Sequence, residues 1–112
     1  MSLASRKADL LVGLEAGLVS LPDVIRMARS GDEAAAGLSL RHVLTASSTP
    51  QVQVVLERYH HLAGGLADPP LRFVVEPKAR GKRLAALAAA LEWRPGAWPG
   101  FPWTQPPAGW WA

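Results

Sequence analysis

Short stretches of helical hydrophobic spacing, each closed by glycine or proline, constrain the fold of this chain more than any other feature. Leucines recur at intervals of three and four over residues 5–18, and Gly17 marks the end of that stretch. Comparable stripes follow in four further segments, which are residues 20–30, 39–46, 49–64 and 78–91. The sequence therefore predicts an all-α fold, a compact bundle of about five short helices.

Two helix starts are marked by capping residues. Ser20 and Asp23 have the spacing of a capping box, with Asp in place of the usual Glu, and Pro22 falls in the first turn. Thr49 and Pro50 are interpreted as the N-cap and first residue of another helix. Between these two starts, residues 32–37 (DEAAAG) predict a single helical turn, and Ser39 is expected to cap a short helix.

Two segments do not have a helical pattern. Residues 66–77 (LADPPLRFVVEP) contain three prolines, so LRFVV is expected to be an extended connection rather than a lone strand. Residues 94–112 contain five prolines and four tryptophans, which predicts an extended, polyproline-like tail. We therefore expect a helical domain over residues 1–93 and a tail over residues 94–112.

The composition excludes several classes of protein. The 112 residues include no cysteine, so disulfides, thiolate metal sites and a cysteine nucleophile are absent. An apolar content of 49% is too high for a wholly disordered chain. No apolar run reaches the ~18 residues of a membrane span. The basic and then apolar N-terminus is interrupted by Asp9 and Glu15, so a helix explains it better than a signal peptide.

The residues needed for catalysis do not form a recognisable constellation. His60 and His61 are adjacent, so on a helix they point about 100° apart and cannot hold one metal together. Ser47, Ser48 and Thr49 precede a helix and are explained as caps. We expect no enzymatic activity, metal, cofactor or small-molecule substrate.

Positive charge is concentrated late in the chain. Residues 1–63 sum to zero charge, and residues 64–112 carry the whole net charge of +3. Four cations fall within KARGKR, at Lys78, Arg80, Lys82 and Arg83. The start of a helix disfavours cations but attracts anions, so this placement predicts a phosphate contact. The alternative is a solvated surface at a helix start that lies a few residues from its predicted position.

The aromatic tail also allows more than one interpretation. Its anchors are Trp98, Phe101, Trp103, Trp110 and Trp111. These side chains either cover an apolar groove of the same chain or dock on a protein partner, since aromatics are typical interface anchors. Stacking on single-stranded nucleic acid is less favoured, because Arg94 is the one cation interleaved with them.

Three segments have an order and spacing that can be compared with a known family. Gly17 is followed by SLPDVI (residues 20–25), LSLRHVLTA (residues 38–46) has the pattern of a short helix, and the last segment is LRFVVEPKARGKRLAALAAALE (residues 71–92). In this order they resemble the first segments, the short helix and the closing segment of the actinobacterial integration host factor family. The resemblance implies a helix–two-turns–helix domain that binds duplex DNA with little sequence preference, bends or compacts it, and assists phage integration.

This chain departs from the family pattern at two places. The family hairpin has a glycine-rich turn of the kind G-x-G-K-x-x-A, whereas residues 48–55 read STPQVQVV. The family's arginine run before the last helix is reduced to Arg72, and the tail is not part of the family pattern. A divergent copy encoded by a phage or mobile element fits these differences.

The resemblance gives two sets of expected DNA contacts. The principal set is Arg72, Lys78, Arg80, Lys82 and Arg83, and the secondary set is Thr49, Gln51 and Gln53. The sequence thus predicts a cytoplasmic, nucleoid-associated or integration-assisting protein that binds double-stranded DNA with little or no specificity. The alternative is a protein-interaction module, such as a phage accessory or structural protein, that docks through its tail.

Overall fold

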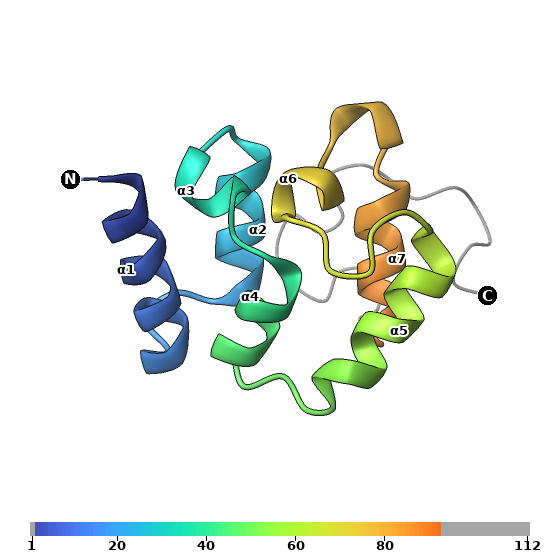
Figure 1. Cartoon of the computed structure of the whole chain (residues 1–112), viewed down its shortest axis with the longest axis horizontal. Helices are drawn as coiled ribbons and strands as arrows, with labels where there is room; N and C mark the ends of the chain where they lie inside the picture. Colours follow the sequence, from blue (N-terminus) through green and yellow to red (C-terminus); the bar gives the residue numbers. More distant parts are fainter. Residues whose placement is uncertain (1, 93–112) are drawn as a thin grey trace.

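Hydrogen-bonded caps divide this chain into short helices. The structure, a computed structural model, describes residues 2–92, which form seven α-helices and one 3₁₀ helix (Figure 1). In chain order these are α1 (Leu3–Ala16), α2 (Leu21–Arg29), α3 (Glu33–Ala36), α4 (Leu40–Ala46), α5 (Val52–Ala63), α6 (Leu71–Val74), η1 (Pro77–Ala79) and α7 (Lys82–Ala90). The predicted all-α fold is confirmed, with seven helices in place of about five. The predicted tail, with its five aromatic anchors, lies outside the described residues.

Side-chain caps begin the first four helices. In each one the N-cap oxygen accepts a hydrogen bond from the backbone amide three residues further on; these N-caps are Ser2, Ser20, Asp32 and Ser39. Asp23 also accepts from the Ser20 amide at 3.1 Å, which confirms the capping box. Gly17 ends α1 in a left-handed conformation, as its position predicted.

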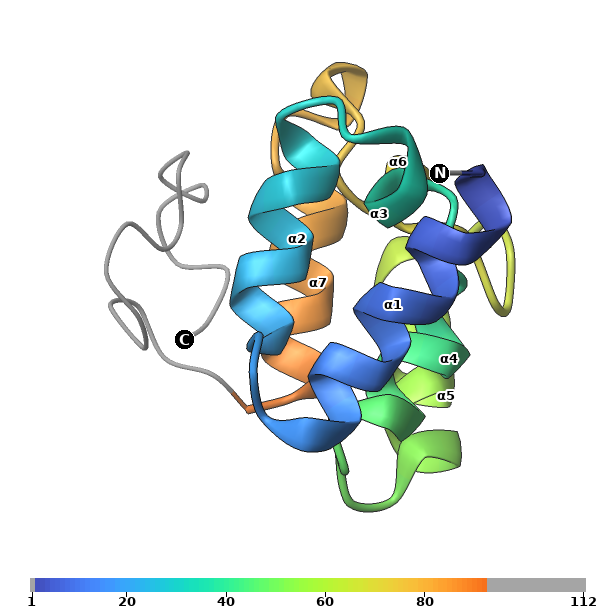
Figure 2. The same cartoon turned by 90° about the vertical axis from the view of Figure 1, so that its left-hand side faces the viewer.

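The helices pack in two groups that meet at α6. In the first group α1 packs against α3 and α4, and α2 packs against α3. In the second group α5 and α7 lie side by side, as Figure 1 shows. The short helix α6 contacts α2, α3 and α7. The helix α4 contacts α5, and Figure 2 shows these two beside each other. A small central helix therefore links both ends of the molecule.

The prediction of an extended LRFVV segment is wrong, because these residues form α6. Pro70 is the N-cap of α6, where a missing amide proton is not needed. Leu71 and Val74 are buried at 0% and 1% exposure against the neighbouring helices. Tertiary burial thus overrides the strand preference of β-branched residues.

Two backbone hydrogen bonds join the starts of α4 and α6. The Leu40 amide donates to the Pro69 carbonyl at 2.9 Å, and the Leu71 amide donates to the Leu38 carbonyl at 2.8 Å. They form an isolated antiparallel bridge between Ser39 and Pro70. Each helix therefore has its first amide satisfied by the segment that precedes the other helix.

The predicted core is largely confirmed. The stripe of α2 is buried, with Val24 and Ile25 both fully inaccessible to solvent. The spacing over residues 5–18 and 49–64 also predicts buried positions for Leu18 and Leu62, and this is wrong, because they are 80% and 56% exposed. Leu18 lies beyond the end of α1, and Leu62 lies in the last turn of α5. The helical spacing continues to these residues, but no helix packs over them.

Candidate nucleic-acid interface

The basic segment, residues 78–83, does not lie within one helix. Pro77, Lys78 and Ala79 form η1, and then Arg80 and Gly81 both adopt left-handed conformations with φ of 52° and 78°. Two consecutive left-handed residues cannot continue a right-handed helix, so α7 begins at Lys82. The prediction of a continuous helix from Lys78 to Leu91 is therefore wrong by one turn at its start.

Four of the five cations predicted to contact DNA are exposed. They are Arg72 on α6, Lys78 on η1, Arg80 before α7 and Lys82 at its first position. No salt bridge within residues 2–92 involves any of the four. Their charges are therefore not neutralised by the described carboxylates.

The start of α7 adds donors to this region. Its N-cap is Gly81, which has no side chain to accept a hydrogen bond, and no acidic residue lies in the first turn. The first amides of a helix have no intrahelical partner, and the helix dipole places positive charge there. This end of α7 thus favours an anion.

A hollow of about 310 Å³ lies beside this helix start. Arg80 and Gly81 line it together with Arg29 from the end of α2. Arg29 was not among the predicted contacts, because its place beside Arg80 depends on how α2 packs, which spacing along the sequence does not reveal. Glu76 also lines the hollow, but its carboxylate is paired with Arg83.

Arg83 differs from the other four cations. Its guanidinium lies 2.6 Å from the Glu76 carboxylate and donates to the Phe73 carbonyl at 3.1 Å. It also stacks over the Phe73 ring at 3.7 Å from the centroid. Arg83 is half-buried, and these contacts hold α7 to the end of α6. The Arg83 charge is therefore largely balanced within the protein by Glu76.

The secondary predicted set lies at the other end of α7. Thr49 is half-buried with its hydroxyl 3.0 Å from the Ser47 hydroxyl, and it does not cap α5. Gln51 is the N-cap, in a left-handed conformation with φ of 54°, so the predicted cap at Thr49 is wrong. Gln53 accepts from Arg41 at 2.7 Å and donates to Glu57 at 3.2 Å.

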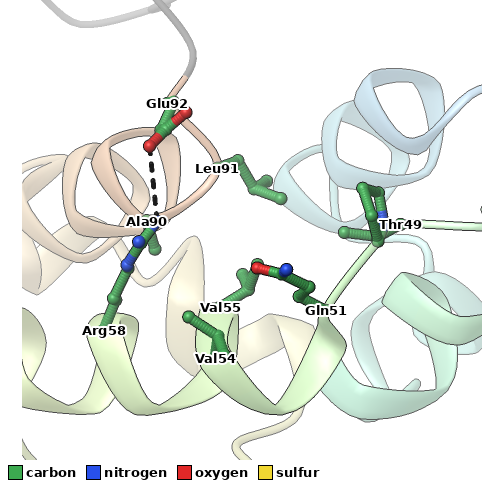
Figure 3. Close-up of a pocket in the computed structure, with 9 residues that line it drawn as sticks. Thr49, Gln51, Val54, Val55, Arg58, Ala90, Leu91 and Glu92 are labelled. Atoms are coloured by element: carbon green, nitrogen blue, oxygen red, sulfur yellow. Dashed lines mark hydrogen bonds and ion pairs between the residues drawn. The ribbon is translucent and has the colours of Figure 1, made fainter.

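The structure does not bring the two predicted sets together. Thr49 and Gln51 share a hollow with Ala90, Leu91 and Glu92 at the end of α7, which Figure 3 shows. The basic segment lies at the start of the same helix, and a helix of nine residues is about 13 Å long. A single phosphate cannot contact both sets.

The described residues show no metal-binding arrangement. No group of three or more His, Asp or Glu side chains within residues 2–92 is placed to hold a metal ion. His42, His60 and His61 are all exposed. In the same part of the chain, no helix has the length and hydrophobicity needed to cross a lipid bilayer.

The fold and the site define a small all-α protein with a locally basic surface around the start of α7, the last helix within residues 2–92. Comparison with known proteins adds no family to this description: no family model, curated protein or solved structure matches the chain.

Proposed function

We propose that this chain binds double-stranded DNA with little sequence preference, through the surface around the start of α7. The observation that carries the proposal is a group of three exposed cations around an uncapped helix start, Lys78, Arg80 and Lys82, none of which has a salt bridge among residues 2–92. Arg72 on α6 is a fourth exposed cation without such a salt bridge. Phosphate contacts of this kind fix a protein on a duplex without reading its sequence. Arg29 lines the same hollow as Arg80 and adds one more guanidinium group to this surface.

The order of elements also supports a nucleoid-associated or integration-assisting role like that of the actinobacterial integration host factor family. The matched segments fall on α2, on α4 and on the run from α6 to α7. The hairpin between α4 and α5 has no glycine, yet Ser48 and Gln51 adopt φ of 59° and 54° there. Glycine favours this conformation, so these two positions have a backbone that a glycine-rich turn would also allow.

Salt dependence of DNA binding is the direct test. Four phosphate contacts predict a slope of about −4 for the logarithm of affinity against the logarithm of salt concentration. Binding to random duplexes is to be measured by fluorescence anisotropy at several salt concentrations. A slope near zero, or no binding at low salt, would show the proposal to be wrong.

Single substitutions locate the contacts. Lys82→Ala should weaken binding on every sequence alike and make the slope shallower by about 1. Arg6→Ala is the matched control, because it removes the same charge from α1, where Arg6 pairs with Asp32. Equal effects of both substitutions would indicate a response to net charge rather than contacts at α7.

A further inference from the structure

The groove between the start of α5 and the end of α7, here called the α5–α7 groove, has no partner among residues 2–92. It has a volume of about 360 Å³, near the lower end of the range for ligand pockets. Figure 3 shows that Val54, Val55 and Arg58 rise from α5 and face Leu91 and the end of α7. The volume suits one large side chain better than an extended ligand.

The wall formed by α5 suits an aromatic ring. Val54 is 37% exposed although it is apolar, and Val55 lies beneath it in the core. Arg58, one turn further along α5, reaches across the groove to Glu92 at 3.4 Å. An apolar floor with a guanidinium at its edge favours an aromatic ring by hydrophobic contact and by cation–π attraction.

The sequence supplies such a ring directly beyond the groove. All five tryptophans of the chain lie in residues 93–112, which follow Glu92, itself a groove residue. Trp98 is six residues from Glu92, so an extended chain gives it a reach of about 20 Å. Pro95–Gly96 lies between them, and this dipeptide favours tight turns that reverse a chain. Trp98 therefore has both the length and a turn signal needed to return to the groove.

We propose that Trp98 docks in the α5–α7 groove of its own chain, between Val54 and Leu91 and beside the Arg58 guanidinium. Covalent attachment favours this occupant, because a short linker gives a high effective concentration at the groove. The docked ring would cover Thr49 and Gln51, which line the same groove. The inference does not depend on DNA binding, and its test uses none.

Tryptophan fluorescence of the full chain tests the proposal, because residues 2–92 contribute no tryptophan signal. The probe is the full-length protein with the other four tryptophans changed to Phe, leaving Trp98 alone. We expect blue-shifted emission and protection from acrylamide. A second version that keeps Trp110 alone provides the comparison, because Trp110 is eighteen residues beyond Glu92 in the sequence.

Substitutions in the groove give the decisive comparison. Val54→Asp places a carboxylate against the ring and should lower the ratio of docked to undocked Trp98 about tenfold or more. Arg58→Gln should act in the same direction by removing the cation. Leu66→Asp is the control, because Leu66 is also apolar and exposed, at 54% against 37% for Val54, but lies after α5 and does not line the groove. Circular dichroism and thermal unfolding verify that each variant is folded.

The outcomes separate the possible occupants. Trp98 that is red-shifted and freely quenched in the parent overturns the proposal, as does protection that persists in both Val54→Asp and Arg58→Gln. Protection that disappears on dilution assigns the groove to the tail of a second copy and also overturns docking within one chain. Protection that is independent of concentration and lost in both groove variants supports it.

Discussion

Tyr59 is the one buried polar side chain of the described residues without a hydrogen-bond partner. It lies on α5 with 0% exposure, and its hydroxyl contacts no acceptor. Burial raises the pKa of Tyr59 from 10.0 to about 12, an effect partly opposed by the positive charge of Arg83. Burying this hydroxyl therefore costs desolvation free energy that no hydrogen bond in the folded protein offsets.

Substitution of Tyr59 should reveal this cost. Tyr59→Phe removes the unpartnered hydroxyl, so the free energy of unfolding should stay unchanged or rise by up to about 1 kcal/mol. The free energy of unfolding of the wild type should fall by about 2–3 kcal/mol between pH 10 and about pH 12. The reason is that Tyr59 ionises at lower pH in the unfolded chain than in the folded protein, where its pKa is about 12. Urea unfolding at neutral pH and near pH 12 measures both effects. An equal alkaline loss in Tyr59→Phe would attribute that loss to other groups.

Arg83 should act mainly on stability. A double-mutant cycle of Arg83→Gln and Glu76→Gln should give a coupling of about 0.5–1 kcal/mol, the range for a partly exposed ion pair. Denaturant unfolding measures the coupling. Suppose instead that Arg83→Gln weakens DNA binding as much as Lys82→Ala and leaves the free energy of unfolding unchanged. Arg83 would then act in DNA binding, and its contacts with Glu76 and Phe73 would not stabilise the fold.

At the level of single elements, local signals predicted helix starts well where a side chain makes the cap. The Ser20–Asp23 box and the Ser39 cap depend on residues three positions apart, so the sequence contains all the information. The starts of α5 and α7 were misplaced because Gln51 and Arg80 adopt left-handed conformations that their residue types rarely take. The helix α6 was missed because its stability comes from contacts distant in sequence.

The left-handed start of α5 provides a test of stored backbone strain. Gln51→Gly should increase the free energy of unfolding by about 0.5–1 kcal/mol. Glycine adopts φ of 54° without steric cost, and this gain exceeds the loss from the greater conformational entropy that glycine gives the unfolded chain. Thermal or urea unfolding measures the change. Gln53→Gly, within α5, is the control and should destabilise by a similar amount. A destabilised Gln51→Gly variant would mean that the Gln51 side chain stabilises the hairpin more than its backbone strains it.

For the whole molecule, helical spacing predicted the class of fold and most of the core, because burial of one helix face is a local periodic signal. The candidate site was predicted only in part. Clustering in sequence identified Lys78, Arg80 and Lys82, but the approach of Arg29 from α2 and the pairing of Arg83 with Glu76 depend on packing. The groove beside Glu92 likewise depends on how α5 and α7 pack together.

The two hydrogen bonds donated by the Leu40 and Leu71 amides determine how this part of the protein unfolds locally. The helices that they begin have seven and four residues, too short to persist alone in water. Separating either segment exposes a donor and an acceptor on both, so the two regions, some thirty positions apart along the polypeptide, should come apart in a single event. Native-state hydrogen exchange should then report the same opening free energy at both amides. If the Leu71 amide exchanges much faster than the Leu40 amide, the two segments open independently, and α6 unfolds before α4.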